Sequence, residues 1–331
     1  MRKLSILLAW NGNNADQLIA DAKVADESGI DALFVAETWG QDPFTLLTLL
    51  AYETQHVKLG TAVANIYART PAVLAQHFAT LDQLSNGRMI IGLGTSGPNV
   101  IEHFHGVKFE KPFTRMREYV EIINTLMRRE KLFYSGSVFQ LQRGFRLRMQ
   151  PVRPHIPIYL ASMNPKSVRQ TAEIADGWLP IFLPKEHWKP QLDAFYESVA
   201  AAGRKREDVG VLCPYTITVT DDPERAAFAR RVLIVRYIAR MGNFYYDQFV
   251  RLGYQAAADA VRAAYAEGGS EEAAYSALPQ AVVDQLGFAG SVEACRDALD
   301  EAAAAGFTLL SISVPESNMH KRAAIYRQLV G

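Results

Sequence analysis

The stretch that decides the fold is LGTAVANIYARTPAVLAQ, residues 59–76. An apolar run, LGTAVANI, ends at Tyr67, and Thr70 with Pro71 then begins a segment that has the composition of a helix. Proline is favoured in the first turn of a helix because its missing N–H would have no partner there. This stretch therefore predicts one buried strand followed by one helix.

The same unit recurs along the whole chain. Apolar runs that are nearly continuous, as in parallel strands covered on both faces, are each followed by a helical pattern. The expected strands are 4–9, 31–36, 56–64, 88–93, 156–161, 177–182, 209–219 and 307–314. Eight such units in 331 residues favour an α/β fold of the (β/α)8 TIM-barrel type over a doubly wound sheet.

Two segments depart from this period. In residues 131–154, apolar and polar residues alternate loosely, and several of them are aromatic residues and arginines. This pattern predicts an excursion with a short hairpin. Residues 225–286 are rich in Ala, Tyr and Arg and predict extra helices. Because no linker or low-complexity tract interrupts the chain, we expect residues 1–331 to form a single domain.

The composition disfavours several classes of protein. Equal numbers of basic and acidic residues, 35 of each, argue against nucleic acid as the main partner. Cys213 and Cys295 lie far apart without a CxxC spacing, which favours a reducing compartment over a disulfide framework. No stretch approaches the roughly 20 apolar residues of a membrane span, and Asn-Gly-Asn-Asn follows residues 1–10 where a signal peptide would have a cleavage site. We therefore expect a cytoplasmic protein with no membrane partner.

In a barrel of this type the ligand site lies at the carboxyl ends of the strands. Two loops there, GLGTSGPN (92–99) and ASMNPKS (161–167), combine glycine, hydroxyl and amide residues just before helices. Free N–H groups and the helix dipole favour a phosphate at such positions, although either loop could equally be an ordinary tight turn. GLGTSG (92–97) has the GxGxxG spacing, but it follows the fourth expected strand and not the first, so a Rossmann site is not expected. The sequence has no HExxH and no GxSxG, so a metal site and a hydrolase elbow are not expected either.

Taken together, these loops resemble the bacterial luciferase-like superfamily. The resemblance is carried by FVAETWGQD (34–42), by the run 59–98 and by residues 153–181, and LSNGRMIIGLGTSGPNVIEHFHG (84–106) is its most specific part. It covers most of the chain and is weakest at 131–150 and 225–275. Within the superfamily the chain is most similar to the branch of coenzyme F420-dependent oxidoreductases, which includes methylenetetrahydromethanopterin reductase.

This resemblance implies an enzyme that transfers a hydride between C5 of coenzyme F420 and a small organic substrate. It also implies a cis peptide bond between Ala62 and Val63, in a bulge of the third strand against which the deazaflavin ring rests. Two alternatives stay open: an FMN-dependent luciferase-like monooxygenase, and a flavin-binding protein without catalysis. The resemblance further implies a homodimer or a higher homo-oligomer.

The family's binding positions can be carried over onto residues of the strand ends. The loop at 95–97 and the loop at 162–164 are expected to hold the polar tail of the cofactor. Relatives commonly have glycines in the second loop, and Asn164 tolerates a positive φ better than most residues. For Trp178, packing in the core is the alternative to contact with the cofactor. The expected cofactor-binding residues are Thr61, Ala62, Val63, Asn65, Thr95, Ser96, Gly97, Ser162, Met163, Asn164 and Trp178.

The catalytic residues follow less directly from the resemblance. Several relatives place a histidine after the acidic residue that ends the second strand, but here Thr38 follows Glu37. A glutamate that donates a proton in some relatives is also missing, and Pro98 stands near its place. Glu37 is therefore the first candidate acid or base and Glu102 the second, with a structural carboxylate as the alternative role of Glu37. Trp39 is expected in the substrate pocket, and no motif identifies the substrate.

Overall fold

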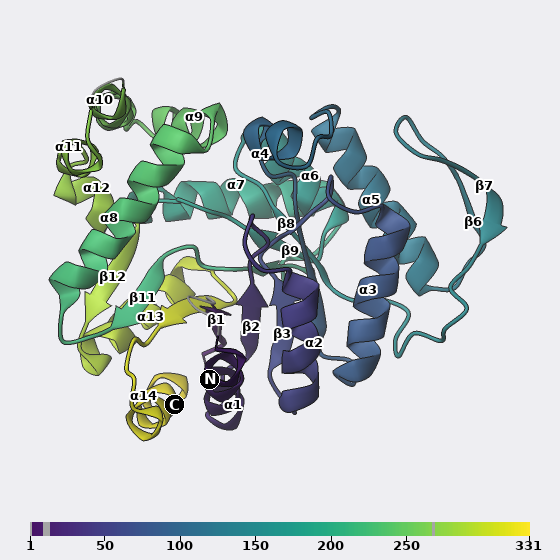
Figure 1. Ribbon diagram of the computed structural model, residues 1–331, viewed down its shortest axis with the longest axis horizontal. Helices are drawn as coiled ribbons and strands as arrows, with labels where there is room; N and C mark the ends of the chain where they lie inside the picture. Colours follow the sequence, from purple (N-terminus) through teal and green to yellow (C-terminus); the bar gives the residue numbers. More distant parts are fainter. Residues whose placement is uncertain (1, 9–13, 267–268) are drawn as a thin grey trace.

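The computed structural model describes residues 2–8, 14–266 and 269–331 (Figure 1). Its centre is a parallel sheet in which the barrel strands follow one another in the order in which they occur in the chain. The barrel strands are β1 (Leu4–Leu8), β2 (Ala32–Val35), β3 (Lys58–Thr61), β5 (Met89–Gly94), β8 (Ile158–Ala161), β9 (Gly177–Leu179), β10 (Gly210–Val211) and β13 (Leu310–Ser313).

The two ends of this strand order meet. β13 pairs in parallel with β1, and a parallel bridge joins Leu212, directly after β10, to Leu309, directly before β13. The N–H of Cys213 also donates to the carbonyl of Leu309 at 2.8 Å. The (β/α)8 barrel predicted from the sequence is therefore confirmed. Between β10 and β13, a single bridge takes the place of a longer hydrogen-bonded ladder.

Helices follow the strands and cover the outside of the sheet (Figure 1). They begin where the sequence supplies caps: the Thr70 hydroxyl, for example, accepts the N–H of Val73 at 3.3 Å. The covering helices are α1 (Ala15–Glu27), α2 (Pro43–Glu53), α3 (Pro71–Leu84), α5 (Pro112–Met127), α6 (Pro165–Ile174), α7 (Trp188–Ala201), α13 (Val292–Ala305) and α14 (Met319–Val330). Shorter helical pieces are α4 (Pro98–His103), η1 (Lys185–His187) and η2 (Arg206–Asp208).

Two expected strands are broken in the structure. The third ends as β3 at Thr61 and resumes as β4 (Ala64–Asn65), which pairs with β5. The seventh is divided into β10 and β11 (Thr216–Val219). β11 pairs with β13 and with β12 (Gly287–Gly290), a strand that the sequence analysis did not predict.

Both predicted additions to the barrel are present. The excursion forms an antiparallel hairpin, β6 (Leu132–Ser135) and β7 (Gln140–Phe145), which lies at the edge of the molecule (Figure 1). The extra helices are α8 (Pro223–Arg240), α9 (Asn243–Arg251), α10 (Gln255–Tyr265), α11 (Glu271–Ala277) and α12 (Gln280–Asp284).

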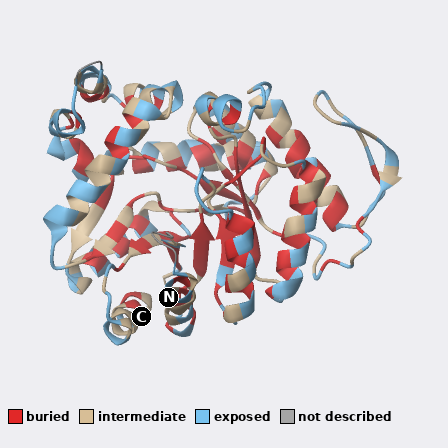
Figure 2. Ribbon diagram, in the orientation of Figure 1, coloured by how far each residue is buried: buried red, intermediate tan, exposed pale blue. Residues whose placement is uncertain are grey.

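Buried apolar side chains form one large core around the barrel strands and a second within helices α8 to α12 (Figure 2). Phe182, in the loop after β9, belongs to the second core, so this loop attaches the added helices to the barrel. Over the described ranges, no helix combines the length and the apolar character that a membrane crossing needs.

Candidate active site

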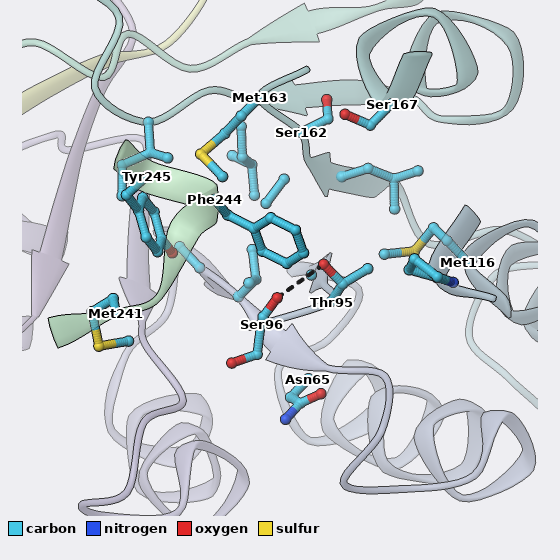
Figure 3. Close-up of a pocket in the computed structure, with 18 of the residues that line it drawn as sticks. Asn65, Thr95, Ser96, Met116, Ser162, Met163, Ser167, Met241, Phe244 and Tyr245 are labelled. Atoms are coloured by element: carbon cyan, nitrogen blue, oxygen red, sulfur yellow. Dashed lines mark hydrogen bonds between the residues drawn. The ribbon is translucent and has the colours of Figure 1, made fainter. Parts of the chain in front are cut away.

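A cavity of about 400 Å³ opens at the carboxyl ends of the barrel strands. Its lining comes from the segments at the ends of β2, β4, β5, β8 and β9, and from helices α8 and α9 above them (Figure 3). A volume of this size falls within the range of small-molecule sites. The cavity therefore lies where the barrel fold and the sequence both predicted the site.

The peptide bond between Ala62 and Val63 is cis, as predicted, and both residues line the cavity. Glycines of β5 allow the backbone around this bond to pack closely. A Cβ at Gly94 would lie 2.3 Å from Cγ2 of Val63, and one at Gly92 would lie 1.7 Å from the carbonyl oxygen of Thr61. Thr61 itself is buried beneath the lining, where its hydroxyl donates to the carbonyl of Gly92 at 2.6 Å.

Asn65 also lines the cavity and is almost fully buried. Its side-chain oxygen accepts the N–H of Tyr67 at 2.8 Å, which fixes the orientation of the amide. Among the described residues, its side-chain nitrogen has no acceptor. This nitrogen is therefore available to donate a hydrogen bond to a ligand.

Glu37 is held by two groups on the neighbouring segment. Its carboxylate accepts the backbone N–H of Asn65 at 2.6 Å and pairs with the Arg69 guanidinium. Arg69 also bonds Asp42 at 2.5 Å and lies over the Phe44 ring. The Glu37 side chain is 8% exposed and that of Arg69 17%, so this ion pair is largely shielded from solvent.

The loop after β5 brings polar groups to the cavity. Thr95 and Ser96 line it, and the Thr95 hydroxyl donates to the carbonyl of Ser96 at 3.2 Å (Figure 3). Ser96 has φ 55°, a left-handed conformation that is uncommon for residues other than glycine. Gly97 caps the short helix α4 with φ −120° and lies just outside the lining.

The loop after β8 faces the first loop across the cavity. Ser162, Met163 and Asn164 all line it. The Asn164 side chain accepts the N–H of Ser167 at 3.0 Å and so caps α6. Asn164 has φ −91°, so the tolerance for positive φ that the sequence analysis invoked is not used here.

Trp178 lies behind this second loop, is buried and does not line the cavity. Its indole N–H donates to the carbonyl of Ser162 at 2.9 Å, and its ring packs against Phe195 with centroids 4.9 Å apart. These contacts give Trp178 a packing role, the alternative considered from the sequence, and they fix the backbone at Ser162.

The two remaining predicted residues, Trp39 and Glu102, differ in their position relative to the cavity. Trp39 lines the cavity and is 54% exposed. Glu102 is exposed and does not line it, and its carboxylate accepts the N–H of Phe109 at 3.1 Å. His105, to which the sequence analysis gave no functional role, is the one imidazole in the lining within the described ranges.

Helices α8 and α9 and the turn between them contribute lining residues that the sequence analysis did not name individually: Tyr237, Met241, Phe244, Tyr245 and Arg251. Phe182 packs edge-on against Tyr237 and Tyr245, and the Phe244 ring lies 5.7 Å from that of Phe109. Burial raises the pKa of both tyrosines, so their phenols stay protonated near neutral pH. The only signal in the sequence was the richness of this segment in aromatic residues.

The comparisons with known proteins agree with this site. A protein-family model described as luciferase-like monooxygenase matches residues 5–309, and the chain therefore belongs to that family. The superfamily resemblance stated from the sequence is thus confirmed.

Particular relatives refine this assignment. The chain is 34% identical to a Mycobacterium tuberculosis protein, provisionally named as a coenzyme F420-dependent oxidoreductase, over 94% of each chain. It is similar in fold to the coenzyme F420-dependent tetrahydromethanopterin reductase of Methanopyrus kandleri, with a TM-score of 0.82, 21% identity, and coverage of 99% of this chain and 97% of that one. It is also similar in fold to an FMN-bound Baeyer–Villiger monooxygenase of Pseudomonas putida, with a TM-score of 0.68, 20% identity, and coverage of 100% and 96%.

Proposed function

We propose that this protein is a coenzyme F420-dependent oxidoreductase that acts on a small, largely apolar organic substrate. One observation carries the proposal: the segment expected to support the ring and both loops expected to hold the tail line a single cavity. The relative at 34% identity, which carries this activity in its provisional name, supports the same choice of cofactor.

The residues present suit a flat ring with a polar tail. Ala62 and Val63 offer small side chains and backbone at one wall, and the unpartnered amide nitrogen of Asn65 can donate to a ring carbonyl. At the other wall, Asn164 caps the ten-residue helix α6, whose amino end favours an anionic group. When bound, coenzyme F420 gives or takes a hydride at C5, which is the redox chemistry of the reaction.

The remaining lining supports an apolar substrate. Large apolar side chains from separate elements surround the space, among them Trp39, Phe113, Met116, Met163 and Phe244. The Glu37 charge is compensated by Arg69, and Arg251 is exposed. A substrate with several charges would lose its hydration here without gaining partners.

We assign Glu37 a positioning role, which is the second of the two roles that the sequence left open. Its carboxylate accepts a backbone N–H and pairs with a guanidinium, and these two contacts fix its position. By accepting the N–H of Asn65, it fixes the β4 segment beside the cis peptide bond. Glu37 thereby orients the wall on which the ring is proposed to lie.

A proton must also be exchanged when a carbonyl group is reduced. We propose His105 for this step, because imidazole exchanges protons near neutral pH and His105 lines the cavity. Glu102 is a weaker candidate because its exposed carboxylate is bonded to the Phe109 N–H outside the cavity.

The proposal is tested by turnover. Reduced F420 is mixed with the protein and a panel of uncharged aliphatic and aromatic ketones under argon, and the return of oxidised F420 is followed by absorbance. Turnover with any ketone supports the proposal and removes the non-catalytic alternative. Protein-dependent insertion of oxygen into a ketone with reduced FMN in air, without any F420 turnover, would instead support the monooxygenase.

A further inference from the structure

A second cavity lies beside the first half of α8, between this helix and strand β12. It is open to solvent, has a volume of about 840 Å³ and shares no lining residue with the candidate active site. Its lining includes Arg230 of α8, Gly287 and Phe288 of β12, and Tyr215. It therefore constitutes a separate space with its own chemistry.

Arg230 is the unusual residue of this cavity. Its guanidinium is partly buried, and burial lowers its pKa. Nη1 donates to the carbonyl of Val283 at 3.3 Å, whereas Nε and Nη2 have no acceptor among the residues described. No carboxylate among the described residues lies within 4.0 Å of the Arg230 guanidinium. Asp284, which lines the same cavity, raises the pKa of Arg230 and partly offsets the effect of burial. A guanidinium carries five N–H donors, so those of Arg230 that have no protein acceptor can bind a ligand.

The other cations of the lining are already satisfied. Arg231 donates to the carbonyls of Tyr275 and Leu278 and to the Gln280 side chain. Lys185 pairs with Glu301, its Nζ lying 2.5 Å from the carboxylate. Arg230 is therefore the cation whose donors remain available to a ligand within the described lining.

Gly287 makes room for the Arg230 guanidinium. A Cβ at Gly287 would lie 2.3 Å from Nε, 2.6 Å from Cζ and 2.8 Å from Nη2. Any other residue at this position would therefore displace the guanidinium. The absence of a side chain at Gly287 therefore leaves space for the guanidinium at the cavity.

Two carboxylates also line the cavity and limit which ligands it accepts. Asp284 accepts the side-chain N–H of Gln280 at 2.7 Å, and Glu224 is exposed. An anion with several separate charged groups would be repelled by both carboxylates. A ligand with one anionic group and an apolar body suits the three aromatic lining residues, Tyr215, Phe228 and Phe288.

We propose that this cavity binds a small oxyanion, either a carboxylate or a phosphate, through the free donors of Arg230. The planar fork of a guanidinium matches two oxygens of such a group and forms charge-assisted hydrogen bonds with them. This inference does not depend on the cofactor or the reaction proposed for the barrel mouth.

The test is calorimetric titration of the whole protein with sodium benzoate and, separately, with inorganic phosphate, at low ionic strength with sodium chloride as the reference. Three variants are compared with the parent chain: Arg230→Gln, Gly287→Ala, and Arg225→Gln as the matched control. Arg225 is an exposed arginine on the same helix that does not line the cavity.

We expect the parent chain and Arg225→Gln to bind one oxyanion per chain, and Arg230→Gln and Gly287→Ala to bind it at least about tenfold more weakly. Binding of benzoate alone identifies a carboxylate ligand, and binding of phosphate alone a phosphoryl ligand. The thermal midpoint of the parent should rise with the bound oxyanion, and that of Arg230→Gln should not. Equal affinities for the parent and Arg230→Gln, or no binding to the parent at millimolar concentration, would overturn the proposal.

Discussion

Replacing Glu37 by glutamine distinguishes a positioning residue from a proton donor. Glutamine keeps the length of the side chain, but it loses the charge that pairs with Arg69 and that strengthens the hydrogen bond from the Asn65 N–H. If Glu37 acts through the Asn65 segment, Glu37→Gln should weaken cofactor binding and lower stability, while turnover at saturating cofactor stays within a few-fold of the parent.

The magnitude follows from the burial of the ion pair. Removing one partner of a fully buried pair costs about 3–5 kcal/mol because the other charge is left unpaired. Here Arg69 keeps Asp42 as a second acceptor and the Phe44 ring beneath it. We therefore expect the free energy of unfolding to fall by only about 1–3 kcal/mol.

Three measurements are needed on the same preparations: urea unfolding, F420 affinity by fluorescence titration, and the turnover number. Asp42→Asn is the matched control, because it removes the other carboxylate from Arg69 and leaves the Glu37–Asn65 contact intact. Asparagine also keeps the cap that Asp42 provides to the N–H of Thr45. This control should retain F420 affinity.

The opposite result would refute the positioning role. A positioned acid or base typically contributes about 10²–10⁴-fold to rate. If Glu37→Gln loses turnover by such a factor while cofactor affinity and stability match the parent, Glu37 transfers the proton itself.

Three further substitutions test the site. Gly97→Asp should lower F420 affinity at least about tenfold, because the carboxylate would repel the cofactor's anionic tail. Gly97→Ala is the control and should bind F420 normally, because the atom nearest to a Cβ at this position, the Met241 carbonyl oxygen, is 3.5 Å away. Equal F420 affinity of the two variants would show that the loop is only a turn. His105→Gln should lower turnover by about 10²–10⁴-fold while F420 affinity matches the parent, and unchanged turnover would exclude His105 as the group that exchanges the proton. Gly92→Ala should lower the free energy of unfolding by at least about 3 kcal/mol, because its Cβ would meet the Thr61 backbone at 1.7 Å, and a stable, soluble variant would contradict this packing.

Much of the barrel could be predicted because local signals and tertiary packing agree. The helix expected to begin at Thr70 and Pro71 occurs as α3 (Pro71–Leu84), because these two residues define its start and its apolar residues face the core. β12 could not be predicted, because GFAG has two glycines and little apolar surface. It is a strand only because β11 lies beside it and supplies hydrogen bonds.

The candidate site was predictable to a similar extent. Thr95, Ser96 and Asn164 follow barrel strands directly, so their position in the chain places them at the cavity. Tyr237 and Phe244 lie on helices added to the barrel, and only tertiary packing brings them over it. The pairing of Glu37 with Arg69 likewise depends on how two neighbouring strand ends meet, which no local pattern specifies.

Parallel binding titrations of the purified protein with F420 and with FMN test the proposed choice of cofactor. We expect saturable F420 binding at micromolar concentration and no FMN binding under the same conditions. Binding of FMN without F420 would contradict this choice.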